Sequence, residues 1–306
     1  MKILITGGTG FIGKQLVQVL SADNELTLLT RSAGKAHLEL GNHHRFLGNL
    51  GALTSLDGFD AVINLAGEPI ADKRWSLEQK QKICDSRWDI TARLTDLFHA
   101  SENPPQLFIS GSAIGIYGDH ALSEPVDESF NLAHFDNTDA NEMFPHSVCS
   151  RWEELAMAAT DKTRVCIIRI GLVLGCEGGA LKKMLLPFKL GGGGIIGSGE
   201  QGMSWIHQQD LIAMIIHLMT HPECQGIYNG TAPAPVSNKQ FTQSLGRALH
   251  RPTFLPMPAS VLNIALGEMS QLLTQGQYVY PKRILASGFE FSYPTLDKAL
   301  TGLLQG

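Results

Sequence analysis

The sequence lacks the features of several specialised classes of protein. Its five cysteines are odd in number and form no C-x-x-C pair, so reduced thiols are expected rather than a disulfide framework. No apolar run approaches the roughly 18 residues of a membrane helix, and the short N-terminal run stops at glycine, unlike a signal peptide. His43-His44 has no third ligand nearby, so no metal site is expected. These absences predict a cytoplasmic protein without a membrane partner.

Positive charge is also scarce. The chain has 24 Lys and Arg against 29 Asp and Glu, a formal net charge of -5, which does not suit broad contact with a phosphate backbone. The 43% hydrophobic and 17% charged fractions across 306 residues are typical of a globular chain with one large domain or two smaller ones. We therefore expect a small-molecule substrate and no nucleic acid partner, and the sequence leaves a homodimer open.

Glycine is concentrated near the N-terminus in an informative pattern. The apolar segment 2–5 runs into TGGTGFIG, and apolar residues then recur at helical spacing. Strand, glycine turn and helix form the context of a dinucleotide-binding fingerprint. Glycines make the turn, allow a diphosphate to approach and let the helix pack closely, while the first N–H groups of the helix face the phosphates. The pattern predicts a nucleotide site at Gly7, Gly10, Phe11, Ile12 and Gly13; a glycine turn without a ligand is the alternative.

The end of the second predicted strand, 25–30, indicates which dinucleotide is preferred. An NAD site usually has an Asp or Glu about 20 residues after the glycines, to hold the ribose 2′-hydroxyl. Here Thr30-Arg31-Ser32 occupies that place, and the nearest acid, Glu25, lies at the other end of the strand. A guanidinium can pair with the additional phosphate of NADP. We therefore expect NADP (NADPH) rather than NAD, with Arg31 as an exposed loop charge as the alternative.

The remaining pattern predicts an α/β fold with a doubly wound parallel sheet. Further strands are expected at 43–47, 60–65, 106–110 and 163–170, separated by helical segments that include 75–99 and 147–159. After Gly171 the pattern changes: 175–202 is expected to be a glycine-rich loop that covers the pocket, and helices follow at 210–219, 238–249 and 260–273. We predict a nucleotide-binding domain over 1–170 and a smaller C-terminal α/β substrate lobe over 171–306.

Several side chains lie where chemistry is expected. Small residues at the end of the fourth strand, Ala66-Gly67, leave room for the cofactor, and Arg87 could reach it from its helix or be a surface charge. Ser112 follows the fifth strand and could bind a substrate oxygen, and Tyr117 could donate a proton from a glycine-flanked loop. The alternatives are a capped turn and a packed ring. Pocket residues are also predicted: Glu68 and Trp205, with loop structure as their alternative, and His207, whose alternative is a residue in a loop held by Asp210.

The chain resembles the extended short-chain dehydrogenase/reductases, and more narrowly their atypical "epimerase family protein" branch. The motifs that carry the resemblance are TGGTGFIG, NLAGEPI, DSR, RIGLVLG, GGALKKMLLPF, GSGEQGMSWIHQQD and LLTQGQYVYPKRILASGFEFSYP. The resemblance implies a Rossmann fold, NADP(H) in the cleft, no well-established substrate and a short C-terminal domain of unknown function at about 250–300. It also implies that Thr30 and Arg31 contact the adenosine side and that Leu65, Ala66 and Arg87 line the cofactor.

The sequence departs from that class at its catalytic pair, a Tyr with a Lys four residues later on one helix. The expected helix, which begins near residue 143, contains neither. Tyr278-x-x-x-Lys282 matches literally, but Pro281 within it disrupts a helix. Ser112 and Tyr117 are the predicted replacements, and His146, near the place of the missing Tyr, is more simply an exposed residue. Two functions stay open: an oxidoreductase or isomerase (epimerase) acting on a small polar or sugar-like substrate, or an NADP(H)-binding sensor or interaction protein without turnover.

Overall fold

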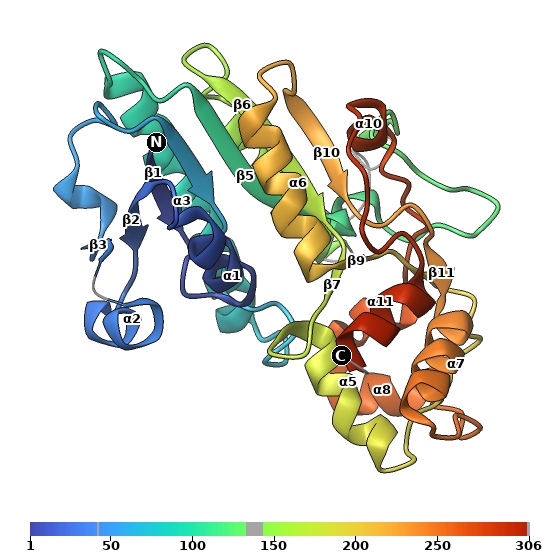
Figure 1. Ribbon diagram of the computed structural model, residues 1–306. Coiled ribbons are helices and arrows are strands. Elements are labelled where there is room, and N and C mark those ends of the chain that lie inside the picture. Colours follow the sequence, from blue (N-terminus) through green and yellow to red (C-terminus); the bar gives the residue numbers. More distant parts are fainter. Residues whose placement is uncertain (42, 133–142, 305–306) are drawn as a thin grey trace.

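A computed structural model describes residues 1–41, 43–132 and 143–304. Its centre is a seven-stranded parallel sheet in the order β10-β6-β5-β4-β1-β2-β3 (Figure 1). The strands are β1 (Lys2–Thr6), β2 (Glu25–Leu29), β3 (Arg45–Leu47), β4 (Ala61–Asn64), β5 (Leu107–Ala113), β6 (Arg164–Ile170) and β10 (Gly226–Gly230). All except β10 lie where the sequence predicts a strand, and the order reverses direction between β1 and β4, as in a Rossmann fold.

Helices cover both faces of this sheet, which confirms the doubly wound architecture. Apolar residues of α1 (Phe11–Leu20) and α6 (Gln208–Thr220), such as Leu16 and Ile215, share one core cluster with β1, β4 and β6. Residues of α3 (Leu77–Ala100) and α4 (Phe144–Met157), such as Phe98, form the cluster on the other face. The short helices α2 (Ala33–Leu40), η1 (Leu50–Ala52) and η2 (Ile114–Tyr117) follow β2, β3 and β5.

The seventh strand is the main feature that the sequence pattern misses. The chain leaves the sheet after β6, makes the excursion 171–207, and returns through α6 to place β10 beside β6. The segment GIYNG of β10 has only two large apolar residues, so it gives a weak strand signal. The division at residue 170 stays a prediction, although two elements that follow it belong to the sheet layer.

The second lobe is mostly helical and has its own small core, which contains Trp205, Phe241 and Leu300. Two pairs of short strands brace it: β7 (Leu172–Leu174) with β9 (Trp205–His207), and β8 (Gly202–Met203) with β11 (Val236–Ser237). Its helices are α5 (Gly179–Lys189), α7 (Asn238–Leu249), α8 (Ala259–Leu266), η4 (Gly267–Ser270), α9 (Gln271–Thr274), α10 (Lys282–Ala286) and α11 (Leu296–Leu304). None of the helices in the described part of the chain has the length and hydrophobicity that a transmembrane segment needs.

Two predictions for this lobe are corrected. The segment 175–202, predicted as a loop, contains the helix α5, because its glycines lie at the ends while the middle, ALKKMLLPFK, favours a helix. The predicted helix 260–273 is divided into α8, η4 and α9. Gly267 adopts φ +62, which breaks the helical path.

Candidate functional site

The glycine turn between β1 and α1 is sterically forced. Gly7 has φ +71, and a Cβ there would lie 2.4 Å from the carbonyl oxygen of Leu65. A Cβ on Gly13 would lie 2.1 Å from the Gly7 oxygen, and the Gly10 N–H donates to that same oxygen at 2.9 Å. The turn therefore packs directly against the chain leaving β4, at the point where the strand order reverses and α/β proteins bind ligands.

The start of α1 leaves backbone donors available at this turn. Gly10 caps the helix without a side-chain hydrogen bond, and the first N–H groups of a helix have no partner within it. The second lobe holds the turn in place from the other side. The ring of Phe11 fits against Gly178 and Gly179, and the Phe11 carbonyl accepts a hydrogen bond of 2.9 Å from Gln208 Nε2.

A buried chain of hydroxyl and amide groups fixes the loop after β4. Thr6 Oγ1 donates to Asn64 Oδ1 at 2.6 Å and accepts from the N–H of Ala66 at 3.2 Å. Asn64 Nδ2 donates to Thr91 Oγ1 at 2.8 Å, and that hydroxyl donates to the carbonyl of Arg87 at 2.7 Å. The predicted cofactor residues on β4 and α3 are thus linked to the first strand by hydrogen bonds.

Arg87 is a half-buried cation that forms no ion pair with the residues that the structure describes. Its Nη1 donates to the carbonyls of Glu68 at 3.1 Å and Ile83 at 2.9 Å, and its Cζ lies 5.2 Å from the centre of the Trp152 ring. Among the described residues, no carboxylate lies within 4.0 Å of its guanidinium, and burial lowers the pKa of Arg87. A Cβ on Gly67 would lie 2.9 Å from Arg87 Cζ, so the guanidinium lies directly beside the strand end. A cation that is partly removed from water without a close counterion is costly, and a bound anion reduces that cost.

Thr30 and Arg31 lie at the end of β2, next to β1. Thr30 is buried, and its Oγ1 accepts a hydrogen bond of 3.3 Å from the N–H of Ser32. Arg31 is exposed, and no ion pair within the described residues includes it. Its side chain is therefore available to an anion at this edge.

Glu68 lies just beyond these cofactor residues. Its backbone N–H donates a hydrogen bond of 2.8 Å to Ser86 Oγ. Its carboxylate forms a loose ion pair with Lys73, at 3.9 Å. The carboxylate remains partly exposed at the strand ends. Its predicted contact with a substrate stays a prediction.

Ser112 and Tyr117 belong to a second buried network. Ser112 Oγ donates to Glu153 Oε1 at 2.7 Å, and Arg169 binds both carboxylate oxygens of Glu153 at 2.8 Å. Arg169 Nη1 also donates to Tyr117 Oη at 2.9 Å, and Tyr117 donates in turn to Asn229 Oδ1 at 2.8 Å. All five side chains are buried.

This network already uses the protons that were predicted to serve catalysis. Burial raises the pKa of Tyr117, which opposes formation of a phenolate even beside Arg169. The Ser112 hydroxyl proton is directed to Glu153. The catalytic roles of Ser112 and Tyr117 stay predictions, and their positions favour the structural alternative for both.

Trp205 and His207, predicted to contact the substrate, are also engaged within the protein. Trp205 is fully buried and its Nε1 donates to the carbonyl of Ala234 at 3.1 Å. His207 caps α6 by accepting the Gln209 N–H at Nδ1, 3.1 Å away, and its ring stacks on Tyr293 at 3.7 Å. Burial lowers the pKa of His207 to about 4, so the ring is neutral at pH 7. Both residues lie in the strand β9 rather than in a loop, and their contacts favour a structural role.

His146 and Ser150 show the spacing of the missing Tyr–Lys pair on α4. His146 Nδ1 lies 2.5 Å from the carbonyl oxygen of Ile116, and its Nε2 lies 3.1 Å from Ser150 Oγ. His146 is half-buried rather than exposed, which corrects the simpler expectation. The signal that could have found the pair is its four-residue spacing at the start of the helix that carries the family dyad.

Sequence reasoning also missed Glu153, Arg169 and Asn229. None of the three belongs to a recognisable motif, and their contacts span from 16 to 112 residues in the sequence. Trp152 was missed as well, and its buried indole N–H has no hydrogen-bond partner in the described structure. This side chain lies against Gly111 of β5, beside Arg87.

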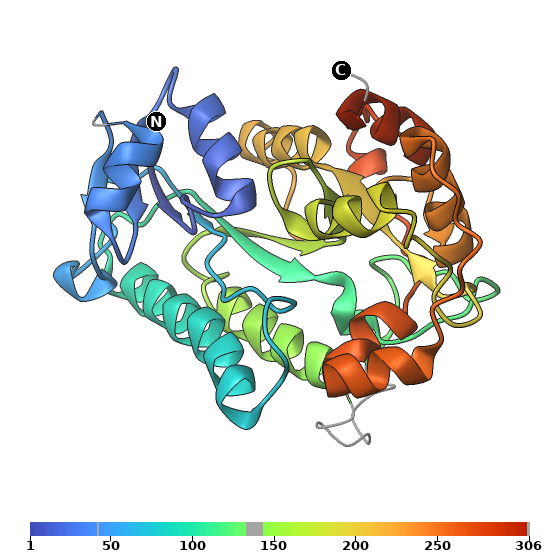
Figure 2. The same ribbon diagram turned by 90° about the horizontal axis from the view of Figure 1, so that it is seen from below.

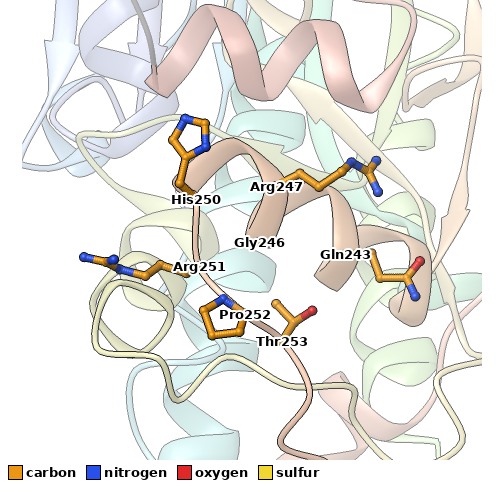
Figure 3. Close-up of a pocket in the computed structure, with 7 residues that line it drawn as sticks. All are labelled: Gln243, Gly246, Arg247, His250, Arg251, Pro252 and Thr253. Atoms are coloured by element: carbon orange, nitrogen blue, oxygen red, sulfur yellow. The ribbon is translucent and has the colours of Figure 1, made fainter.

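A separate surface hollow lies at the end of α7. It is lined by Gln243, Gly246, Arg247, His250, Arg251, Pro252 and Thr253 (Figure 3). Its cationic side chains point in different directions, and Arg247 already pairs with Asp297 at 3.2 Å. The hollow therefore does not converge on one ligand, and we place the functional site at the strand ends.

The sheet order and the glycine turn define a Rossmann-type nucleotide-binding protein. Comparison with known families is more specific. The chain belongs to the NAD dependent epimerase/dehydratase family, whose model matches residues 3–229, and residues 257–303 match a domain of unknown function, DUF1731.

Relatives from several kingdoms align over almost the whole chain. It is 40% identical to the epimerase family protein SDR39U1 homolog, chloroplastic, of Arabidopsis thaliana, over 100% of this chain and 87% of that protein. It is 36% identical to epimerase family protein SDR39U1 of Homo sapiens (98% of each chain) and 37% identical to YfhF of Bacillus subtilis (99% and 98%).

Solved structures show the same fold. The crystal structure of human epimerase family protein SDR39U1 (isoform 2) with NADPH aligns with a TM-score of 0.89 and 34% identity over 100% of both chains. UDP-glucuronic acid 4-epimerase from Bacillus cereus, in complex with NAD, aligns with a TM-score of 0.75 over 100% of this chain and 98% of that one. The identity to that epimerase is 17%, so this likeness concerns the fold alone.

Proposed function

We propose that this protein binds NADP(H) at the ends of β1, β2 and β4 and uses it to reduce, oxidise or epimerise a small molecule. One observation carries the proposal: this edge combines a sterically forced glycine turn with a half-buried guanidinium, that of Arg87, which has no carboxylate within 4.0 Å among the described residues. NADPH in the structure of human SDR39U1 supports it.

Different groups of the protein are expected to bind different parts of the cofactor. The start of α1 suits a diphosphate, because the first N–H groups of a helix have no partner within it and no side chain caps them. We expect exposed Arg31 to bind the additional phosphate of NADP, and Arg87 to supply positive charge beside Gly67. When bound, the nicotinamide supplies hydride chemistry.

Calorimetry with NADPH and NADH tests the cofactor preference. We expect NADPH to bind at least about tenfold more tightly, because a charge-assisted hydrogen bond to phosphate contributes about 1.5–3 kcal/mol. Arg31→Gln removes this preference, whereas Lys35→Gln, which changes an exposed lysine on nearby α2, preserves it. Equal affinities for NADPH and NADH in the unmodified protein would contradict the preference.

A second function, NADP(H) binding without turnover, is favoured by one observation. The hydroxyl protons of Ser112 and Tyr117 are both directed to protein acceptors. NADPH oxidation over a panel of carbonyl compounds and nucleotide sugars separates the two functions. Turnover supports the enzyme, with Ser112→Ala and Tyr117→Phe deciding whether these hydroxyls take part. Tight NADPH binding without any turnover supports the second function.

A further inference from the structure

The helix α5 begins directly against the glycine turn. The ring of Phe11, the first residue of α1, packs on the backbone that leads into α5. A Cβ on Gly175, Gly178 or Gly179 would lie 2.8, 2.5 or 2.9 Å from a carbon of that ring, so the contact is close along the whole approach to α5. The start of α5 is therefore next to the backbone N–H groups that the proposed function assigns to the diphosphate.

One turn further along, α5 is tied to the loop 65–76, which leaves the carboxyl end of β4. Lys183 Nζ donates to the carbonyl of Ala71 at 2.9 Å and pairs with the carboxylate of Asp72. In Figure 2 the yellow-green α5 lies between the blue α1 and the orange helices of the second lobe. The first half of α5 thus spans from the glycine turn to the loop after β4.

These two segments border the proposed dinucleotide site. Gly7 of the turn packs on the carbonyl oxygen of Leu65, where the loop 65–76 begins, and Gly67 beside Arg87 follows two residues later. A dinucleotide in a doubly wound fold crosses the carboxyl ends of the strands at this switch point. Because α5 lies beyond those strand ends in Figure 1, a dinucleotide bound there lies between the sheet edge and α5.

The attachments of α5 differ in strength between its two ends. Only two of its eleven residues are buried, and the side chains of Lys183 and Asp72 are 54% and 50% exposed. Exposed ion pairs contribute little to stability, so this attachment breaks readily. The far end is held inside the second lobe, where Arg251 Nε donates to the carbonyl of Lys189 at 2.9 Å. Gly191 follows with φ +79, a conformation that suits a pivot.

We propose that α5 is a lid over the bound dinucleotide and that the ion pair between Lys183 and Asp72 is its latch. Opening moves the start of α5 away from Phe11, separates Lys183 from the loop 65–76 and leaves the end near Arg251 in place. Lid opening then limits both the entry and the release of the cofactor. This inference rests on the proposed function, because it concerns the regulation of the same site.

Stopped-flow measurements with NADPH test the lid. The fluorescence of NADPH reports association, and displacement by excess NADP⁺ reports release. Lys183 contacts the protein rather than the cofactor, so Lys183→Met should raise both rate constants together and leave the Kd for NADPH nearly unchanged. We expect each rate constant to rise about two- to fivefold, the range for loss of an exposed ion pair.

Two further variants serve as matched controls. Lys182→Met removes the same charge from the neighbouring residue, whose Nζ donates to the carbonyl of Glu177 at 3.2 Å within the second lobe. We expect it to leave both rate constants unchanged. The reversed pair, Lys183→Asp with Asp72→Lys, keeps an ion pair at the latch and should restore the rates of the unmodified protein.

The other outcomes contradict the lid. Equal rate constants for Lys183→Met and Lys182→Met would show that no latch exists. Faster release with unchanged association, and hence weaker binding, would make Lys183 a direct ligand of the cofactor. Fast exchange that the reversed pair does not restore would exclude Asp72 as the partner in the latch. Absence of NADPH binding in calorimetry is failure of the proposed function and removes the lid with it, whereas tight binding with unchanged rates overturns the lid alone.

Discussion

The two halves of the sheet's carboxyl edge differ in how their polar groups are satisfied. At β1, β2 and β4, the start of α1 has no side-chain cap, and the guanidiniums of Arg31 and Arg87 have no carboxylate within 4.0 Å in the described structure. At β5, β6 and β10, the polar side chains bind one another, from Ser112 through Glu153 and Arg169. Unsatisfied groups in a folded protein indicate where a ligand completes the structure, whereas a complete network indicates support.

The largest expected effect is a loss of folding stability in the half of the edge at β5, β6 and β10, whose polar side chains bind one another. Glu153→Gln removes the charge that compensates Arg169, and breaking a buried ion pair costs about 3–5 kcal/mol of folding free energy. Chemical denaturation measures this loss. Glu154→Gln on the same helix is the control, because its pair with Arg151 is exposed and should contribute little. Similar stabilities for the two variants would contradict the supporting role of the network.

A substitution in the other half of the edge, at β1, β2 and β4, should lower cofactor affinity rather than folding stability. Arg87→Gln removes a cation without a counterion, so we expect NADPH affinity to fall about 10- to 100-fold while folding stability is kept or rises. Calorimetry with NADPH, and with 2′,5′-ADP, which lacks the nicotinamide half, measures the change in affinity. Chemical denaturation measures the folding stability. A loss of stability as large as that of Glu153→Gln would place Arg87 in the supporting half.

The pH dependence of stability provides a third contrast. The pKa of His207 is about 4 in the folded protein, below its usual value near 6.5, so its contribution is complete above pH 6.5 and is lost as pH falls toward 4. We expect about 3 kcal/mol of folding free energy to be lost between pH 7 and 4, read as the difference between the unmodified protein and His207→Asn. Asn keeps an acceptor for the helix cap. Parallel pH profiles for the two proteins would show that this ring does not titrate as described.

The smallest expected effect is that of Tyr117→Phe. The ring remains packed while its hydrogen bonds to Arg169 and Asn229 are lost, at a cost of about 1.5 kcal/mol. Thermal denaturation measures the cost, and NADPH affinity should not change. A large loss of turnover without this loss of stability would instead support Tyr117 as a proton donor.

Local patterns predicted the fold well because they arise within short segments. The turn at Gly7 to Gly13 and the strand of buried residues at β4 are both specified by neighbours in sequence. The extra strand β10 was not predicted, because its pairing with β6 depends on a distant partner more than on its own residues. Likewise α5 was hidden by the glycines at its ends.

The site was predictable only where one side chain sufficed. The presence of a guanidinium at 87 was visible in the sequence, but its lack of a carboxylate partner depends on how α3 packs. Ser112 and Tyr117 had the correct chemistry for catalysis. Their engagement by Glu153 and Asn229 involves residues 41 and 112 positions away, which no local pattern reveals.

The late position of β10 has a consequence for synthesis. Until residue 230 has left the ribosome, β6 is an open sheet edge, and such an edge can pair with another chain. The hydrogen bond from Tyr117 to Asn229 also cannot form before then, because Asn229 lies on β10. The nascent chain therefore completes its sheet and its innermost polar network in one step, after three quarters of the polypeptide has been made.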